Sequence, residues 1–185
     1  MPALWEMIHS YSLIHDDLPC MDNSDLRRGR PANHIQYGED IALLAGDGLL
    51  TLAFETALSP KSIKLAGAQR GAEAARLLAK AAGAEGMVGG QVIDLQHENQ
   101  RAPIEVLLEM DRKKTGALIQ AAAQMGCAVA GADQKQREAA VEYAACVGLA
   151  FQIRDDILDV ISDPETLGKP VGSDDKTKNP PMCPY

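Results

Sequence analysis

Two aspartate clusters are the residues in this chain whose types and spacing most clearly suggest chemistry. They are Asp16, Asp17 and Asp22 in a DDxxxxD pattern, and Asp155, Asp156 and Asp159 in a DDxxD pattern. Carboxylate oxygens suit hard cations such as Mg²⁺, which is usually held by one or two carboxylates together with waters and substrate phosphates. Two such clusters would hold several Mg²⁺ ions and make an acidic protein a receptor for diphosphate.

The second cluster lies within an expected helix, where it has no evident structural purpose. Asp155 and Asp159 stand four residues apart and share a helix face with Gln152. Like charges at this spacing destabilise a helix by about a few tenths of a kcal/mol, and Asp is a weak helix former. The alternative interpretation is a solvated acidic face. The opposite stripe is apolar and is expected to pack into the protein: Cys146, Ala150, Ile153, Ile157 and Val160.

Basic residues accompany both clusters. Arg27-Arg28 follow the first cluster, Lys113-Lys114-Thr115 lie in an expected helix, and Lys169 follows the second cluster. A guanidinium group binds phosphate bidentately, and an ammonium group binds it as a point charge. Each of these side chains alone is more often a solvated surface charge. Together with two acidic clusters they favour a diphosphate site.

Composition narrows the class of protein. The 185 residues include 18 Lys+Arg and 26 Asp+Glu, for a net charge of −8, which argues against a nucleic-acid partner. We expect no transmembrane helix, because no apolar run reaches eighteen residues. The N-terminal segment resembles no signal peptide. The four cysteines form no CxxC pair, so we expect a reduced, cytoplasmic setting with Cys127 and Cys146 as small buried side chains.

The elements that must position these residues are helices, because the apolar periodicity is helical nearly throughout. Pro19 ends the first, Pro103 begins the fifth, and Asp133 with Gln136 predicts a capping box before the sixth. The expected helices cover about 4–18, 40–58, 61–81, 84–98, 103–129 and the stretch to 161. The sequence therefore predicts an all-α bundle, with the loop DNSDLRRGRPAN after the first cluster.

Five segments resemble the trans-polyprenyl diphosphate synthases, particularly the bacterial farnesyl diphosphate synthases. They are SLIHDDLPCMDNSDLRRGRPANH, GEDIALLAGDGLLTLAFE, GMVGGQVIDLQHE, RKKTGALI and FQIRDDILDV…LGKPVGSD. The resemblance implies an isoprenoid synthase-type all-α bundle around a central cavity. It assigns 1–175 to the catalytic core, without the family's N-terminal and C-terminal helices, and leaves 176–185 as a divergent tail.

The resemblance also implies a reaction. Isopentenyl diphosphate would be condensed with dimethylallyl or geranyl diphosphate to farnesyl diphosphate, by Mg²⁺-assisted ionisation, condensation and elimination. Three Mg²⁺ ions are expected, with Mn²⁺ as an alternative, and the family suggests a homodimer. Three other functions stay open: geranylgeranyl diphosphate synthesis, diphosphate and Mg²⁺ binding by a truncated fragment without turnover, and a terpene cyclase.

The roles implied by the resemblance fall on numbered residues. Asp16, Asp22 and Asp155 would bind Mg²⁺, supported by Asp17, Asp156 and Asp159. Arg27, Lys114 and Lys169 would hold the allylic diphosphate, and Arg28 and His9 would contact isopentenyl diphosphate. The catalytic set near the reacting carbons would be Lys114, Thr115 and Gln152. Gln91 and Asp94 would form hydrogen bonds around the site, and His15 is expected to be structural.

Product length is expected to depend on Tyr11 and Ser12. They precede Asp16 by five and four residues, which is more than one helical turn at about 1.5 Å per residue. In the resembling family, bulky residues there close the floor of the product cavity. We therefore predict a C15 product, with C20 as the second choice.

Overall fold

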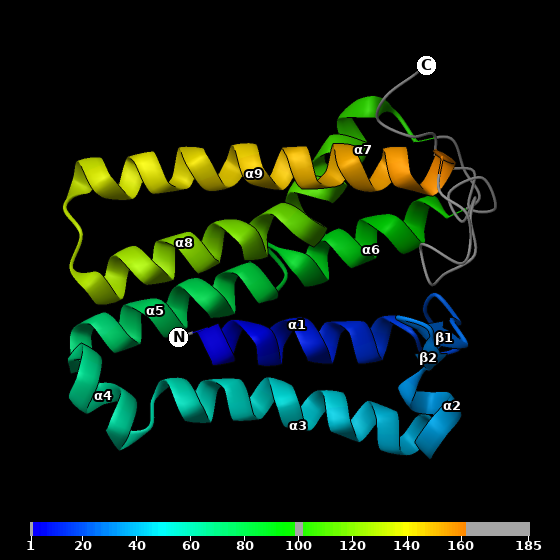
Figure 1. Ribbon diagram of the computed structural model, residues 1–185, viewed down its shortest axis with the longest axis horizontal. Coiled ribbons are helices and arrows are strands. Elements are labelled where there is room, and N and C mark those ends of the chain that lie inside the picture. Colours follow the sequence, from blue (N-terminus) through cyan, green and yellow to red (C-terminus); the bar gives the residue numbers. More distant parts are fainter. Residues whose placement is uncertain (1, 99–101, 162–185) are drawn as a thin grey trace.

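The computed structural model describes residues 2–98 and 102–161, and this part of the chain is almost entirely helical (Figure 1). Its elements are α1 (Pro2–Asp16), β1 (Leu26–Arg27), β2 (Arg30–Pro31), α2 (Asn33–Tyr37), α3 (Glu39–Ala57), α4 (Pro60–Ala66), α5 (Ala68–Ala82), α6 (Met87–His97), α7 (Ile104–Asp111), the π-helical turn η1 (Arg112–Gly116), α8 (Ala117–Ala130) and α9 (Gln134–Ile161). The predicted all-α class is confirmed. Lys169, residues 162–175 of the expected core, and the 176–185 tail lie outside the described residues.

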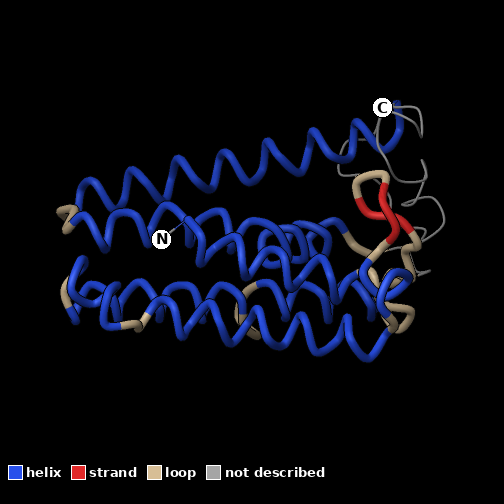
Figure 2. Tube along the Cα trace, turned by 60° about the horizontal axis from the view of Figure 1, so that its bottom comes forward, coloured by secondary structure: helices blue, strands red, loops and turns tan. Residues whose placement is uncertain are grey.

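The long helices lie side by side, with α3 at one edge and α9 at the other (Figures 1 and 2). Contacts connect α1 to α3, α5 to α8, and α8 to α9, while α6 contacts η1. This order places the end of α1 close to α6 and η1. Those are the segments that carry the first aspartate cluster and Lys114.

Local sequence explains where most helices begin and end. Gln136 N–H donates to Asp133 Oδ1 at 2.9 Å, and Asp133 N–H donates to Gln136 Oε1 at 3.0 Å, so the predicted capping box is confirmed. The helix expected over 61–81 is instead two helices, α4 and α5. Gly67 separates them with a φ of 84°, a conformation that costs glycine little and other residues more.

Two other local features differ from the prediction. The loop after the first cluster contains a short antiparallel hairpin, in which Arg27 pairs with Arg30 and Leu26 with Pro31. Strands of two residues are too short to show alternation in the sequence. The helix expected over 103–129 is present as α7 and α8, but η1 joins them as a π-helical turn.

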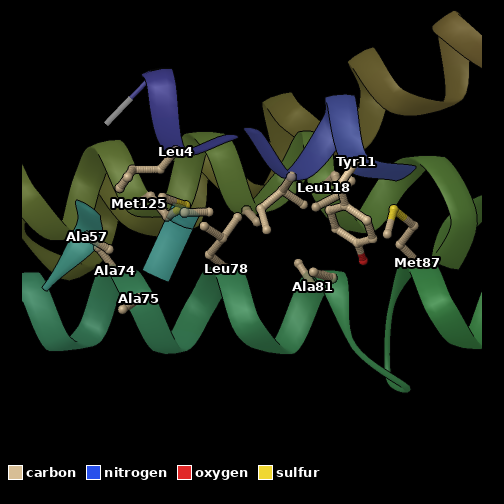
Figure 3. Packing of buried hydrophobic residues seen from close by; sticks show 14 residues of the cluster. Leu4, Tyr11, Ala57, Ala74, Ala75, Leu78, Ala81, Met87, Leu118 and Met125 are labelled. Carbon is tan, nitrogen blue, oxygen red and sulfur yellow. The ribbon is translucent and has the colours of Figure 1, made fainter. Parts of the chain in front are cut away.

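The core is built largely from small side chains between α1, α3, α5 and α8 (Figure 3). Ile8, Leu78 and Met125 are its largest fully buried members, and Tyr11 is 6% exposed. The alanines that pack around them are Ala53, Ala57, Ala74, Ala75, Ala81, Ala82 and Ala121. Small residues let the helix backbones approach closely. Trp5 Nε1 donates to the Leu118 carbonyl at 3.0 Å, which joins α1 to α8.

The orientation of α9 corrects one prediction. Cys146, Ala150 and Ile157, which we expected to be covered, are exposed, and Ile153 is only half-buried. The covered side instead contains Ala144 and Gly148. Within the described residues α9 packs on α8 and η1, so one side only is covered. An apolar stripe indicates that a helix can be buried. The neighbouring helices decide which side of it is covered. Cys127, which we also expected to be buried, is half-buried.

No single helix in residues 2–98 and 102–161 is long and apolar enough to cross a membrane. Among the described helices, α3 and α4 pass this test of length and composition when taken together, and they meet at a bend of 47°.

Candidate active site

The first aspartate cluster lies where α1 ends. Asp17 N–H still donates to the Leu13 carbonyl at 3.2 Å, and the chain then turns back on itself. The turn closes when Asp22 N–H donates to the Asp16 carbonyl at 2.9 Å, which brings the third aspartate beside the first. The DDxxxxD spacing therefore forms a compact loop rather than a helix face.

Asp17 forms an ion pair with Arg27. Its carboxylate is 2% exposed and accepts hydrogen bonds from Arg27 Nε at 3.1 and 3.2 Å and from Arg27 Nη2 at 2.5 Å. The β1–β2 hairpin supplies Arg27, and the next residue, Arg28, is exposed with a φ of 54°. A buried carboxylate needs such a partner, since an unpaired buried charge is costly. In this arrangement Asp17 holds the Arg27 guanidinium beside the other two aspartates of the first cluster.

Asp16 meets α6 through Gln91, whose side-chain amide donates to Asp16 Oδ1. Burial raises the pKa of Asp16 to about 6. The negative charge of Asp22 adds to this rise, and the nearby Lys114 opposes it. The half-buried Asp16 thus lies beside the more exposed Asp22, and a cation would relieve the repulsion between their carboxylates.

Lys114 reaches the same site from η1. Its Nζ lies 2.6 Å from Asp94 Oδ2 on α6. Burial lowers the pKa of Lys114, but Asp94 and Asp16 outweigh it and hold the pKa above its ordinary value. The approach depends on Gly90, where a Cβ would lie 2.3 Å from the Lys114 backbone nitrogen. A π-helical turn against a glycine therefore places this ammonium group, and such turns are frequent at functional sites.

The second cluster approaches through Gln152. Thr115 Oγ1 lies 3.3 Å from Gln152 Oε1, and the two helices are close there because Gly148 faces Gly116. Asp155 follows one turn later and is exposed. The side chains of Asp156 and Asp159 lie outside the described residues, as does Lys169.

The sequence profile of the polyprenyl synthetase family matches residues 1–183. The chain belongs to the polyprenyl synthetase family. It is 51% identical over 175 residues to the farnesyl diphosphate synthase of Geobacillus stearothermophilus. The matched region covers 91% of this chain and 57% of that relative. It is 50% identical over 172 residues to geranylgeranyl pyrophosphate synthase 3, chloroplastic, of Arabidopsis thaliana. This match covers 91% of this chain and 48% of the plant protein.

Solved structures of the polyprenyl synthetase type show the same fold. The crystal structure of geranyltransferase from Helicobacter pylori, complexed with magnesium and isoprenyl diphosphate, matches with a TM-score of 0.84 at 38% identity. The match covers 91% of this chain and 55% of that one. The present chain thus spans about half the length of the relatives it matches.

The remaining expected residues of this polyprenyl synthetase chain lie along α1. His9 is half-buried and stacks on Trp5, with ring centroids 5.2 Å apart and planes at 25°. Burial lowers the pKa of His9, and the positive charges of Arg28 and Arg27 add to that effect. Ser12 Oγ donates to the His9 carbonyl at 2.9 Å, a bond within its own helix. The negative charge of Glu6 opposes this lowering of the His9 pKa.

The structure brings the first cluster together with Gln91, Lys114 and Asp94, but it does not show the two clusters meeting. Within the described residues no three His, Cys, Asp or Glu side chains are close enough to form a metal-binding group. The amides and carboxylates of GGQVIDL were expected around the site, and the Gln91 and Asp94 contacts agree with this. Sequence reasoning missed the role of Gly90, although two adjacent glycines inside a helix were a signal that another backbone comes close.

Proposed function

We propose that this chain forms the catalytic core of a short-chain prenyl diphosphate synthase. Isopentenyl diphosphate would be condensed with dimethylallyl or geranyl diphosphate to farnesyl diphosphate. One observation supports this most directly: Asp16 and Asp22 share a partly buried site with Lys114 and Arg27. This reaction requires carboxylates that bind a metal cation and basic side chains that bind a diphosphate. The two aspartates would serve the first purpose, and Lys114 and Arg27 the second.

The carboxylates at the end of α1 fit Mg²⁺. Asp16 has its pKa raised to about 6 by burial and by the charge of Asp22, so this pair gains from a divalent cation. The donors are oxygens, which Mg²⁺ prefers. Asp16 and Asp22 would therefore hold Mg²⁺, with Asp155 as a further ligand in the proposal. When bound, Mg²⁺ would supply positive charge to the leaving diphosphate.

The chain's own residues would bind and orient the substrates. Lys114 would exchange Asp94 for a diphosphate oxygen, and Arg27 would bind the same group while Asp17 still orients it. Arg28 and His9 are proposed to contact isopentenyl diphosphate. Thr115 Oγ1 and Gln152 Oε1 lie together, so their oxygen dipoles would face the allylic carbon as it becomes positive.

Tyr11 supports a C15 product. Its ring lies in the core among Ala81, Met87 and Leu118, one turn and more below Asp16 (Figure 3). A bulky, well-packed ring at this depth would stop a growing chain after three isoprene units. The second choice is C20, because the chain is about as similar to a plant geranylgeranyl pyrophosphate synthase, at 50% identity, as to a bacterial farnesyl diphosphate synthase, at 51%.

The proposal includes a homodimer. The outer face of α3 exposes Ile41, Leu44 and Leu52, at spacings of three and eight residues that fall on one side of the helix. Gly48 lies between Leu44 and Leu52 on the same helix, and a side chain there would meet nothing within 4 Å. A second copy of the chain is the proposed occupant, and sedimentation of the Leu44→Asp variant against the unaltered protein checks it. A dimer that persists unchanged in the variant would contradict this assignment of the face.

Product analysis tests the enzyme assignment. The purified chain is incubated with Mg²⁺, labelled isopentenyl diphosphate and dimethylallyl or geranyl diphosphate, and the products are separated after phosphatase treatment. Farnesol is expected, and chelation of Mg²⁺ should abolish it. Geranylgeraniol would support the C20 alternative. A hydrocarbon formed from farnesyl diphosphate would indicate a cyclase, and diphosphate binding without turnover would indicate a fragment.

A further inference from the structure

His15, the residue before Asp16, makes a contact that the proposed reaction does not use. Its Nε2 lies 3.0 Å from the Leu43 carbonyl on α3. A carbonyl oxygen only accepts hydrogen bonds, so this nitrogen carries the proton and donates. Asp47 Oδ1, also on α3, lies farther away, 3.9 Å from the same nitrogen. The last turn of α1 is therefore bonded to α3 through a side chain.

Gly46 on α3 leaves the space in which the His15 ring lies. A Cβ built on Gly46 would be 2.0 Å from His15 Nε2 and 2.3 Å from its Cδ2, and the residue is buried. Two residues later, Gly48 has nothing within 4 Å of such a Cβ. Of the two glycines in LAGDG, only Gly46 must lack a side chain, because the His15 ring occupies the space beside it.

The ring is also held from its own helix. Tyr11 contacts it edge-on, with centroids 5.7 Å apart and planes at 82°. The His15 carbonyl accepts a hydrogen bond from Leu18 N–H at 3.1 Å, which begins the turn that returns to Asp22. His15 thus contacts α3 with its side chain and starts the aspartate loop with its backbone.

We propose that His15 is a positioning residue for the first aspartate motif. By bonding to the Leu43 carbonyl across Gly46, it fixes where α1 ends relative to α3, and with that end the positions of Asp16 and Asp17. The inference rests on the proposed function, because it takes Asp16 to bind Mg²⁺. It differs from a packing role in that loss of the contact should weaken Mg²⁺ binding more than it weakens the fold.

The test measures Mg²⁺ affinity by calorimetry in the presence of inorganic pyrophosphate, and unfolding by urea, for the same set of variants. His15→Ala should weaken Mg²⁺ binding about tenfold, within the range seen when supports of metal ligands are removed. His15→Gln, which keeps a side-chain N–H donor, should stay within about threefold. Leu4→Ala is the control for stability, since Leu4 is 3% exposed on the far end of α1. That variant should unfold more easily yet bind Mg²⁺ within about twofold of the unaltered protein.

A second comparison uses the two glycines. Gly46→Ala should weaken Mg²⁺ binding about tenfold, and Gly48→Ala should leave it unchanged. In the His15→Ala background, Gly46→Ala should add less than about twofold, because the group it displaces is gone. If Gly46→Ala does not fold, the comparison of His15→Ala with His15→Gln decides.

Two results would overturn the inference in different ways. Equal Mg²⁺ affinity in His15→Ala and the unaltered protein would refute the positioning role and leave the proposed function standing. No Mg²⁺ binding by the unaltered protein would refute the metal site of the proposed function, and the inference with it.

Discussion

Gln91 on α6 donates a hydrogen bond to Asp16 at the end of α1, across 75 residues of sequence. This bond holds one carboxylate oxygen of Asp16, and the proposed function assigns the carboxylate to a cation. It also gives α6 a direct part in the site, beside the Asp94 contact with Lys114. The first aspartate motif is therefore supported from α3, α6 and the β1–β2 hairpin, and not by α1 alone.

Replacing Gln91 should weaken metal binding. Gln91→Leu removes the donor and leaves Asp16 Oδ1 without its partner in a partly buried site, which raises the pKa of Asp16 further. We expect Mg²⁺ affinity, measured with inorganic pyrophosphate, to fall about 10- to 100-fold. Gln96→Leu is the matched control, because Gln96 is exposed on the same helix. Equal losses in the two variants would contradict a specific role of Gln91.

Asp16 should make the metal-free protein less stable at neutral pH than at low pH. Its pKa is about 6 in the folded chain against 3.8 for the free group, so the folded state binds the proton more tightly. The destabilisation is absent below about pH 4, grows as pH rises through this interval, and is complete above about pH 6. Asp22 and Asp17 add to it, whereas Lys114 and Arg27 oppose it.

Urea unfolding in a chelator checks this with Asp16→Asn. The variant should exceed the unaltered protein in unfolding free energy by about 1–3 kcal/mol at pH 7.5, and the difference should vanish near pH 4. An Asn side chain keeps an oxygen that accepts from Gln91. A difference that does not change with pH would argue against a shifted carboxylate.

Gly90 should be far less tolerant of a methyl group than a glycine in open space. In Gly90→Ala the new Cβ would meet the Lys114 backbone at 2.3 and 2.6 Å, so α6 and η1 must separate. We expect a loss of about 2 kcal/mol in unfolding free energy, and loss of the Lys114–Asp94 contact. Gly126→Ala on α8 meets nothing within 4 Å, and should stabilise by about 0.5–1 kcal/mol. Similar effects in both variants would refute the close approach.

Sequence periodicity predicted the long helices, but it missed the short helix α2 and the junctions between helices. The apolar spacing and the Asp133–Gln136 capping box located α9, since both are local signals. The η1 turn was missed, and the glycine against which it packs, Gly90, is distant in sequence. The same holds for the ion pair of Asp17 with Arg27: the motif names both residues, but only the hairpin shows that one orients the other.

The covered side of α9 could not be read from its pattern either. The stripe from Cys146 to Ile157 is apolar, yet the close approach of Gly148 to Gly116 turns the Gln152 side towards η1. Backbone contact at glycines decided the orientation, and glycine adds nothing to an apolar stripe. The same rotation places Gln152 beside Thr115, whose hydroxyl lies 3.3 Å from Gln152 Oε1.

Shortening Tyr11 should change the product. Tyr11→Ala opens space among Ala81, Met87 and Leu118, directly below the aspartate motif, so a longer prenyl chain would fit. We expect C20 and longer products in place of C15, and a loss of about 3 kcal/mol in unfolding free energy from the cavity. Tyr143→Ala is the control, since that ring is 71% exposed on α9. Because Tyr11 also contacts the His15 ring, Mg²⁺ affinity should fall in Tyr11→Ala but not in Tyr143→Ala. An unchanged product distribution in Tyr11→Ala would rule out Tyr11 as the floor of the product cavity.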